Sequence, residues 1–181
     1  MATVAITGHT KGIGLALAKK FESQGYSVIG FSRSNGYDIS VDQDKIIEQI
    51  QHADIFINNA HHAVGQIELL KRITDIWQDT GKLIINLSSK GAFVPDGFRD
   101  QYCQAKREQN KFVKSRILLD SPRIMNIVVG LVDTDLSKQW NYKKILPEDL
   151  AKLIYDLTTS PMSVQEIVLE VPGFDWRVYS K

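Results

Sequence analysis

The sequence predicts an α/β fold with a doubly wound, mostly parallel sheet and helices on both faces. Two observations carry this prediction. Short apolar runs typical of buried strands alternate along the chain with longer segments whose apolar residues recur at helical spacing. The first strand and helix are joined by a glycine-rich turn, and no repeat or low-complexity tract interrupts the alternation. We therefore expect one domain over residues 1–181.

Each element has its own local signal. Apolar runs predict strands at Thr3–Thr7, Tyr26–Phe31, Ala53–Ile57, Lys82–Leu87, Arg123–Val129 and Gln165–Val171, with a very short additional strand over Tyr37–Ile39. Helical spacing predicts helices from Ile13 to Gly25, after Ser40, over Val64–Asp79 and Gln101–Leu119, and from Pro147. Ser40 and Gln43 fit a capping box, and Pro147 suits the first helical position.

Composition narrows the functional class. The net charge is +1, so nothing favours binding to nucleic acid or to a membrane surface. No apolar run approaches the length of a membrane-spanning helix. Cys103 is the only cysteine, so a disulfide within the chain is excluded. A reducing, cytoplasmic location is the simplest expectation.

The glycine-rich turn, Thr7-Gly8-His9-Thr10-Lys11-Gly12-Ile13-Gly14, follows a predicted strand and opens a predicted helix. Glycines in this position let backbone N–H groups approach a pyrophosphate, and the helix N-terminus adds partial positive charge. We therefore predict a dinucleotide site here. The alternative is an ordinary strand-to-helix turn that happens to be rich in glycine.

The second predicted strand ends in Ser32-Arg33. An acid at this place binds the ribose 2′-hydroxyl of NAD, whereas a basic residue favours the 2′-phosphate of NADP. Arg33 is present, no acid is, and Lys11 could reach the same phosphate. The two cations favour NADP(H), unless both are simply solvated surface residues.

Ser89, Tyr102 and Lys106 form the candidate catalytic group. If Tyr102 opens a helix, Lys106 lies one turn further on the same face. A phenol titrates near 10, and a neighbouring ammonium should lower that pKa and make the phenol a useful acid or base. A serine hydroxyl can hold a carbonyl oxygen. Taken alone, Tyr-x-x-x-Lys is equally typical of a surface helix.

The order of these pieces resembles the short-chain dehydrogenases/reductases. The matching segments are TGHTKGIG at Thr7–Gly14, NNA at Asn58–Ala60, NLSS at Asn86–Ser89, YCQAK at Tyr102–Lys106 and GLVDT at Gly130–Thr134. The resemblance implies a Rossmann-like fold, with Tyr102 as acid/base, Lys106 lowering its pKa and holding the nicotinamide ribose, and Ser89 positioning the substrate carbonyl, with Ser88 as the alternative. It places the cofactor against Gly8, Thr10, Lys11, Gly12, Ile13, Gly14, Ser32, Arg33, Asp38, Ile39, Asn59, Ala60, Tyr102, Lys106, Val132 and Thr134.

The resemblance implies an NADP(H)-dependent oxidoreductase that moves hydride between nicotinamide and a small carbonyl or alcohol substrate. The alternative is a catalytically reduced NADP(H)-binding sensor or regulatory protein. Family members pair through the helices expected at Val64–Asp79 and Gln101–Leu119. These helices carry more apolar positions than one sheet face needs, and this excess predicts a homodimer or homotetramer.

The sequence also departs from the family. Relative to the family, the helix between the second strand and the very short third one at Tyr37–Ile39 is reduced to Asn35-Gly36. The helix and loop after Ala60 are largely missing, and the loop between Asp135 and Pro147 is very short. The second deletion removes the clear position of the family's fourth catalytic residue, an Asn, and places His61 or His62 near it. Adjacent histidines rarely face one metal ion, and no third ligand stands at suitable spacing, so we expect no metal site.

Overall fold

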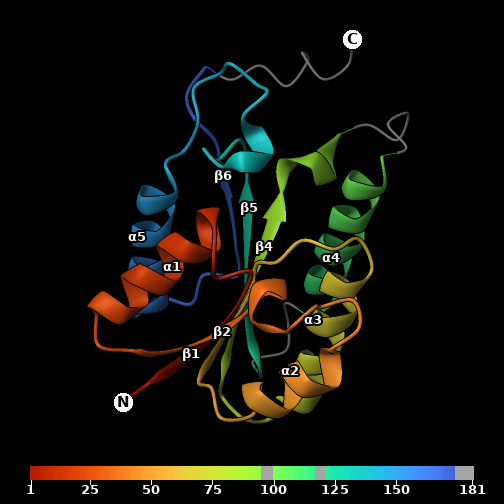
Figure 1. Cartoon of the computed structure of the whole chain (residues 1–181), viewed down its shortest axis with the longest axis vertical. Coiled ribbons are helices and arrows are strands. Elements are labelled where there is room, and N and C mark those ends of the chain that lie inside the picture. Colours follow the sequence, from red (N-terminus) through yellow and green to blue (C-terminus); the bar gives the residue numbers. More distant parts are fainter. Residues whose placement is uncertain (95–99, 117–120, 174–181) are drawn as a thin grey trace.

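The computed structural model describes residues 1–94, 100–116 and 121–173 (Figure 1). At its centre lies one six-stranded parallel sheet in the order β2-β1-β3-β4-β5-β6. The strands are β1 (Thr3–Thr7), β2 (Ser27–Phe31), β3 (Ile55–Asn58), β4 (Leu83–Ser89), β5 (Arg123–Val129) and β6 (Glu166–Leu169). The helices are α1 (Gly12–Ser23), α2 (Gln43–Ile50), α3 (Gly65–Ile76), α4 (Gln101–Arg116) and α5 (Pro147–Thr158), with 3₁₀ turns η1 (Arg33–Asn35), η2 (Lys90–Phe93) and η3 (Asp135–Ser137).

Helices cover both faces of the sheet, as the sequence predicts (Figure 1). α1 and α5 bury Leu17, Phe21 and Ile154 against one set of alternating strand residues. α2, α3 and α4 cover the other face, where Trp77 packs with its ring centroid 6.5 Å from that of Phe56. Because successive strand side chains point to opposite faces, each strand contributes to both layers.

The chain changes direction between β1 and β3. From β1 it moves outward to β2, then returns to the other side of β1 to form β3 and continues through β4, β5 and β6. In open parallel sheets the crevice at such a switch point, beyond the carboxyl ends of the strands, is where ligands bind. The residues that follow β1, β3, β4 and β5 therefore meet at one edge.

The very short strand predicted over Tyr37–Ile39 does not form, and the predicted capping box at Ser40 is also wrong. The chain turns there instead, and α2 begins one residue after Asp42. The Asp38 carboxylate accepts hydrogen bonds from the backbone N–H and hydroxyl of Ser40, and the Asp42 carboxylate accepts from the Asp38 N–H. These local side-chain bonds compete with strand pairing.

A row of buried amides crosses the middle of the sheet. Asn58, Asn86 and Asn126 stand in register on β3, β4 and β5. Asn58 donates to Asn86 at 3.0 Å, Asn86 donates to Asn126 at 2.9 Å, and Asn126 donates to Asn110 of α4 at 3.0 Å. Buried polar groups need such partners, and this row ties the strands and α4 together just below the carboxyl edge.

The exposed faces of α3 and α4 are polar. Ile76, 45% exposed, is the large apolar side chain on the described part of these helices that is most open to solvent. Their other exposed positions carry polar groups such as those of Glu68, Lys71 and Lys111. On α3 and the described part of α4 the apolar positions are thus largely used against the sheet, whereas residues 117–119 of the predicted helix Gln101–Leu119 lie outside the described residues. Within the described residues, no helix is both long and apolar enough to cross a membrane.

Candidate active site

The glycine-rich turn after β1 is built on close backbone contacts. Gly8 has φ +71° and Gly12 has φ +48°, which is a left-handed conformation that side chains disfavour. A Cβ on Gly14 would lie 2.1 Å from the Gly8 carbonyl oxygen. Only glycine at position 14 allows the start of α1 to fold back on the turn.

The end of β3 holds this turn in place. The Thr7 hydroxyl accepts hydrogen bonds from the backbone N–H groups of Asn59 and Ala60, both at 3.0 Å. The Asn59 side chain donates to the Thr7 carbonyl at 2.9 Å. A Cβ on Gly8 would lie 3.0 Å from the Asn59 amide nitrogen. Gly8, Asn59 and Ala60 thus come together at the switch point, and Thr7, which joins the two segments, is not among the predicted site residues.

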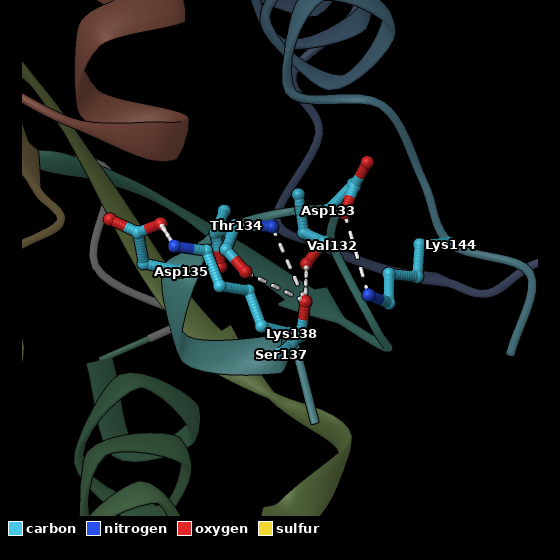
Figure 2. A network of polar contacts seen from close by, with 7 residues as sticks. All are labelled: Val132, Asp133, Thr134, Asp135, Ser137, Lys138 and Lys144. Carbon is cyan, nitrogen blue, oxygen red and sulfur yellow. Dashed lines mark hydrogen bonds and ion pairs between the residues drawn. The ribbon is translucent and has the colours of Figure 1, made fainter. Parts of the chain in front are cut away.

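Thr134 reaches the same turn from the end of β5. A Cβ on Gly12 would lie 2.9 Å from the Thr134 Cγ2 atom. Figure 2 shows how the segment that carries Thr134 is held: the Ser137 hydroxyl donates to the Val132 carbonyl at 2.6 Å and accepts from the Thr134 N–H at 3.3 Å. Lys138 pairs with Asp135, and Lys144 lies 3.4 Å from Asp133.

The remaining predicted cofactor residues lie around this turn in two groups. Thr10, Lys11 and Arg33 are exposed. The pKa of Asp135 is lowered mainly by its hydrogen bond with Lys138, and Lys11 contributes less. The pKa of Asp38 is lowered mainly by its hydrogen bonds from Ser40, and Arg33 contributes less. The second group is partly or fully buried. The side chains of Ile13, Ile39 and Val132 pack against the core, and Ser32 caps the N-terminus of η1.

Ser89 and Tyr102 come together at the end of β4. The Ser89 hydroxyl accepts a hydrogen bond from the Gly91 N–H at 3.1 Å. A Cβ on Gly91 would lie 3.1 Å from the Tyr102 ring and 3.4 Å from the Ser89 hydroxyl oxygen, so these three residues are in contact. A hydrogen bond with the Ser89 side chain acts to lower the pKa of Tyr102. Ser88 lies elsewhere, because its hydroxyl donates to the Asn110 amide oxygen at 2.6 Å.

Lys106 is only 4% exposed. Its ammonium donates to the Gln66 amide oxygen and to the Leu87 carbonyl oxygen, each at 2.9 Å, and lies 5.8 Å from the centroid of the Tyr102 ring. Both acceptors are neutral. Burial lowers the pKa of Lys106 to about 7.

The pKa of Tyr102 does not follow the sequence prediction. Burial raises it above its usual value, and this effect outweighs the hydrogen bond with Ser89. The prediction that Lys106 depresses the pKa of Tyr102 is therefore wrong for the protein without ligands. The physical reason is that burial disfavours both charged forms, the phenolate and the ammonium.

His61 and His62 have separate places. The His61 ring packs edge-on against Tyr102, with ring centroids 4.8 Å apart. Partial burial and the nearby Lys106 lower the pKa of His61, while a hydrogen bond with the Gln66 side chain raises it. His62 accepts a hydrogen bond from the Gly65 N–H at 3.0 Å and so caps the start of α3. In the part of the chain that the structure describes, no three His, Cys, Asp or Glu side chains gather as a metal site would require.

The residue beside Lys106 is Gln66 of α3, which the sequence reading missed. A glutamine on a helix has no sequence signal for this role, because its partner lies 40 positions away. Only its place in the first turn of the helix before the Ser89 strand could have suggested it. Cys103 is buried, and its sulfur lies 4.0 Å from a carboxylate oxygen of Asp100.

These features fit a dinucleotide. Among the described residues, no side chain caps the N-terminus of α1, where Lys11 precedes the helix. The first N–H groups of a helix lack partners within the helix and favour an anion. With glycines at positions 8, 12 and 14, backbone rather than side chains lines the approach to that helix end.

Comparison with solved structures agrees with this fold. No family model and no curated protein matches the sequence. A short-chain dehydrogenase from Burkholderia cenocepacia in complex with NADP superposes with a TM-score of 0.80 at 18% identity, over 94% of this chain and 88% of that one. The chain has the fold of the short-chain dehydrogenases/reductases.

Two further structures share the short-chain dehydrogenase/reductase fold. A 4-hydroxyisoleucine dehydrogenase complexed with NADH has a TM-score of 0.81 at 17% identity, over 94% of this chain and 97% of that one. Serine dehydrogenase from Escherichia coli has a TM-score of 0.74 at 18% identity, over 96% of this chain and 100% of that one. Neighbours with this fold thus include complexes with either nicotinamide cofactor.

Proposed function

We propose that this protein is an NADP(H)-dependent oxidoreductase of the short-chain dehydrogenase/reductase family, acting on a small carbonyl or alcohol substrate. The observation that carries the proposal is the grouping of Ser89, Tyr102 and Lys106 beside the glycine-rich turn at the switch point of the sheet. A protein that only bound a dinucleotide would have no chemical need for this trio.

Each side chain has a role in carbonyl reduction. The bound cofactor supplies the hydride. Tyr102, whose raised pKa keeps it protonated at neutral pH, donates its phenolic proton to the substrate oxygen as negative charge develops there. Ser89 holds that oxygen with its hydroxyl. Lys106 binds the nicotinamide ribose.

The cofactor preference is inferred from Arg33, with Lys11 as a second cation. Both are exposed, and β2 is followed by Ser32 and Arg33 where an NAD site would present an acid. In the complex, Arg33 and Lys11 would each form a charge-assisted contact with the 2′-phosphate or the pyrophosphate. The neighbours in complex with NADP support this choice, and the complexes with NADH leave it to experiment.

The proposal is tested by following NADPH absorbance with a panel of aldehydes and ketones. We expect turnover by the native protein and loss of turnover in Tyr102→Phe. Binding of NADPH in calorimetry without turnover of any carbonyl would instead identify a binding or sensor protein. The second candidate, a catalytically reduced NADP(H)-binding sensor or regulatory protein, is favoured by the shortened segments after Ala60 and between Asp135 and Pro147.

A homodimer or homotetramer remains part of the proposal. The polar exposed faces of α3 and α4 mean that such an interface would rest on charged and amide groups around Ile76 rather than on a wide apolar surface. Light scattering at micromolar concentration and at two salt concentrations measures this. A salt-sensitive dimer mass is the expected result, and a monomer mass at both concentrations would contradict it.

A further inference from the structure

The Lys106 ammonium is held in one direction. An ammonium has three N–H donors, and two of them are taken by the Gln66 amide oxygen and the Leu87 carbonyl oxygen. With two donors fixed, the direction of the third is fixed as well. Leu87 supplies a backbone group of β4, so Gln66 is the side chain that controls where this ammonium points.

Gln66 is itself held rigidly. It is 1% exposed, and its amide nitrogen donates to the Asn58 carbonyl at 3.1 Å and to the Leu87 carbonyl at 3.4 Å. Asn58 in turn donates from its side chain to the Gln66 backbone carbonyl at 3.1 Å. These bonds fix which end of the amide faces Lys106, because the flipped amide would turn its N–H groups toward the ammonium. The position of Lys106 is thereby tied to the end of β3.

His61 forms the neighbouring part of the site. Burial, followed by the charge on Lys106, lowers the pKa of His61, and the Gln66 side chain acts in the opposite direction. His61 in turn packs on the Tyr102 ring and keeps an exposed side, so it forms part of the wall beside the reacting hydroxyl. The charged or titratable groups around His61 are Lys106, Tyr102, His62 and Asp100.

We propose that Gln66 is the positioning residue of this site, a neutral amide that fixes the Lys106 ammonium relative to Tyr102. The neutrality of the amide matters. A carboxylate at this place would pair with the ammonium and cancel the charge that the site offers to the cofactor. The catalytic meaning of the inference rests on the proposed function, but the contact itself does not.

The first test uses the free protein and needs neither cofactor nor substrate. The ammonium of Lys106 is titrated by NMR, with its resonance assigned from Lys106→Met. In Gln66→Glu, which keeps the shape and adds a charge, we expect the pKa of Lys106 to rise by about one unit or more, since an opposite charge within hydrogen-bond distance shifts a pKa by this amount. A Lys106 titration unchanged from the native protein would overturn the proposal.

The second test separates positioning from folding. Gln66→Leu removes the acceptor, and Gln43→Leu is its matched control. Gln43 is a buried glutamine that also tethers the start of α3, because it donates to the Gly65 carbonyl at 3.2 Å. Its other hydrogen bonds join it to Ile39 and Arg72, not to Lys106. We expect both variants to melt earlier. Only Gln66→Leu should lose turnover, by about tenfold or more, with a shifted pH profile.

The outcomes of this second test are distinct. Equal turnover in Gln66→Leu and Gln43→Leu, at native levels or reduced by the same factor, would show that Gln66 has only a structural role. If the native protein turns over no carbonyl, the proposed function fails, and the NMR titration still decides whether Gln66 sets the charge state of its neighbours.

Discussion

Ser88 and Ser89 are adjacent in β4 but serve different parts of the structure. The Ser88 hydroxyl donates to the Asn110 amide oxygen at 2.6 Å and joins the buried row of amides that ties the sheet to α4. The Ser89 hydroxyl accepts from the Gly91 N–H at 3.1 Å and lies against the Tyr102 ring. Because successive side chains of a strand point in opposite directions, only one of the two can face the reacting groups.

This geometry predicts opposite effects of two conservative changes. Ser89→Ala should lower turnover by about tenfold to a hundredfold, because it removes the hydroxyl beside Tyr102, and should leave the free energy of unfolding nearly unchanged. Ser88→Ala should keep turnover but destabilise the fold by about 1 kcal/mol, because it leaves a buried amide short of a partner. Steady-state kinetics and urea unfolding of both variants measure the contrast. The reverse pattern would assign the catalytic role to Ser88.

Tyr102→Phe removes only a hydroxyl and keeps the ring that packs against His61. We expect turnover to fall by about a hundredfold or more, as loss of a general acid should produce. NADPH affinity should stay close to native, because the hydroxyl acts mainly in the transition state. In the oxidation direction, the limb of the pH profile that belongs to the phenol should disappear. Near-native turnover of a good substrate would show that Tyr102 is not the acid.

Arg33→Asp tests the cofactor preference. The new carboxylate would repel a 2′-phosphate and accept hydrogen bonds from a free ribose 2′-hydroxyl, so the preference should reverse from NADPH to NADH. Calorimetric titration of both cofactors into native protein and variant measures this directly. Lys11→Ala is a useful companion, since it should weaken both cofactors if Lys11 binds the pyrophosphate and NADPH alone if it binds the 2′-phosphate. Equal native affinities for the two cofactors would contradict the proposal.

The fold was predictable because its signals are local. The apolar spacing of Leu17 and Phe21 predicts the buried face of α1, and Pro147 marks the first residue of α5, where the structure has it. The incorrect prediction of a strand over Tyr37–Ile39 also comes from local signals. Those residues have strand-like composition, but the carboxylates of Asp38 and Asp42 capture nearby N–H groups and make a turn.

The site was predictable where its residues share a motif and not where they meet only in space. Ser89, Tyr102 and Lys106 were grouped from their spacing and from the family resemblance, and the structure brings them together, while their roles stay predictions. Gln66 was missed because nothing in the sequence joins it to Lys106. The pKa of Tyr102 was predicted with the wrong sign because a pattern of residues does not reveal how deeply the phenol and the ammonium are buried.

The buried ammonium of Lys106 gives a pH dependence of stability whose sign can be worked out. Its pKa is about 7 in the folded protein, against an ordinary value of 10.5. Between these two values the unfolded chain carries a proton that the folded protein lacks, so the free energy of unfolding rises with pH through this window. The contribution is about 1.4 kcal/mol per pH unit, and below pH 7 it becomes constant, because both states are then protonated.

Lys106→Met removes this group and keeps an apolar stem of similar length. The free energy of unfolding of the variant should exceed that of the native protein most at pH 7 and below. This difference should shrink by about 1.4 kcal/mol for each pH unit between pH 7.5 and 9. Urea unfolding of both proteins at several pH values measures this difference in the free energy of unfolding. The titration of groups that both proteins share cancels in the difference. Lys114→Met, which removes an exposed lysine of the same helix, tests whether loss of a charge alone gives the slope. Parallel stability curves for native protein and Lys106→Met would mean that Lys106 stays charged in the folded protein, held by Gln66 and Leu87 strongly enough to offset its burial.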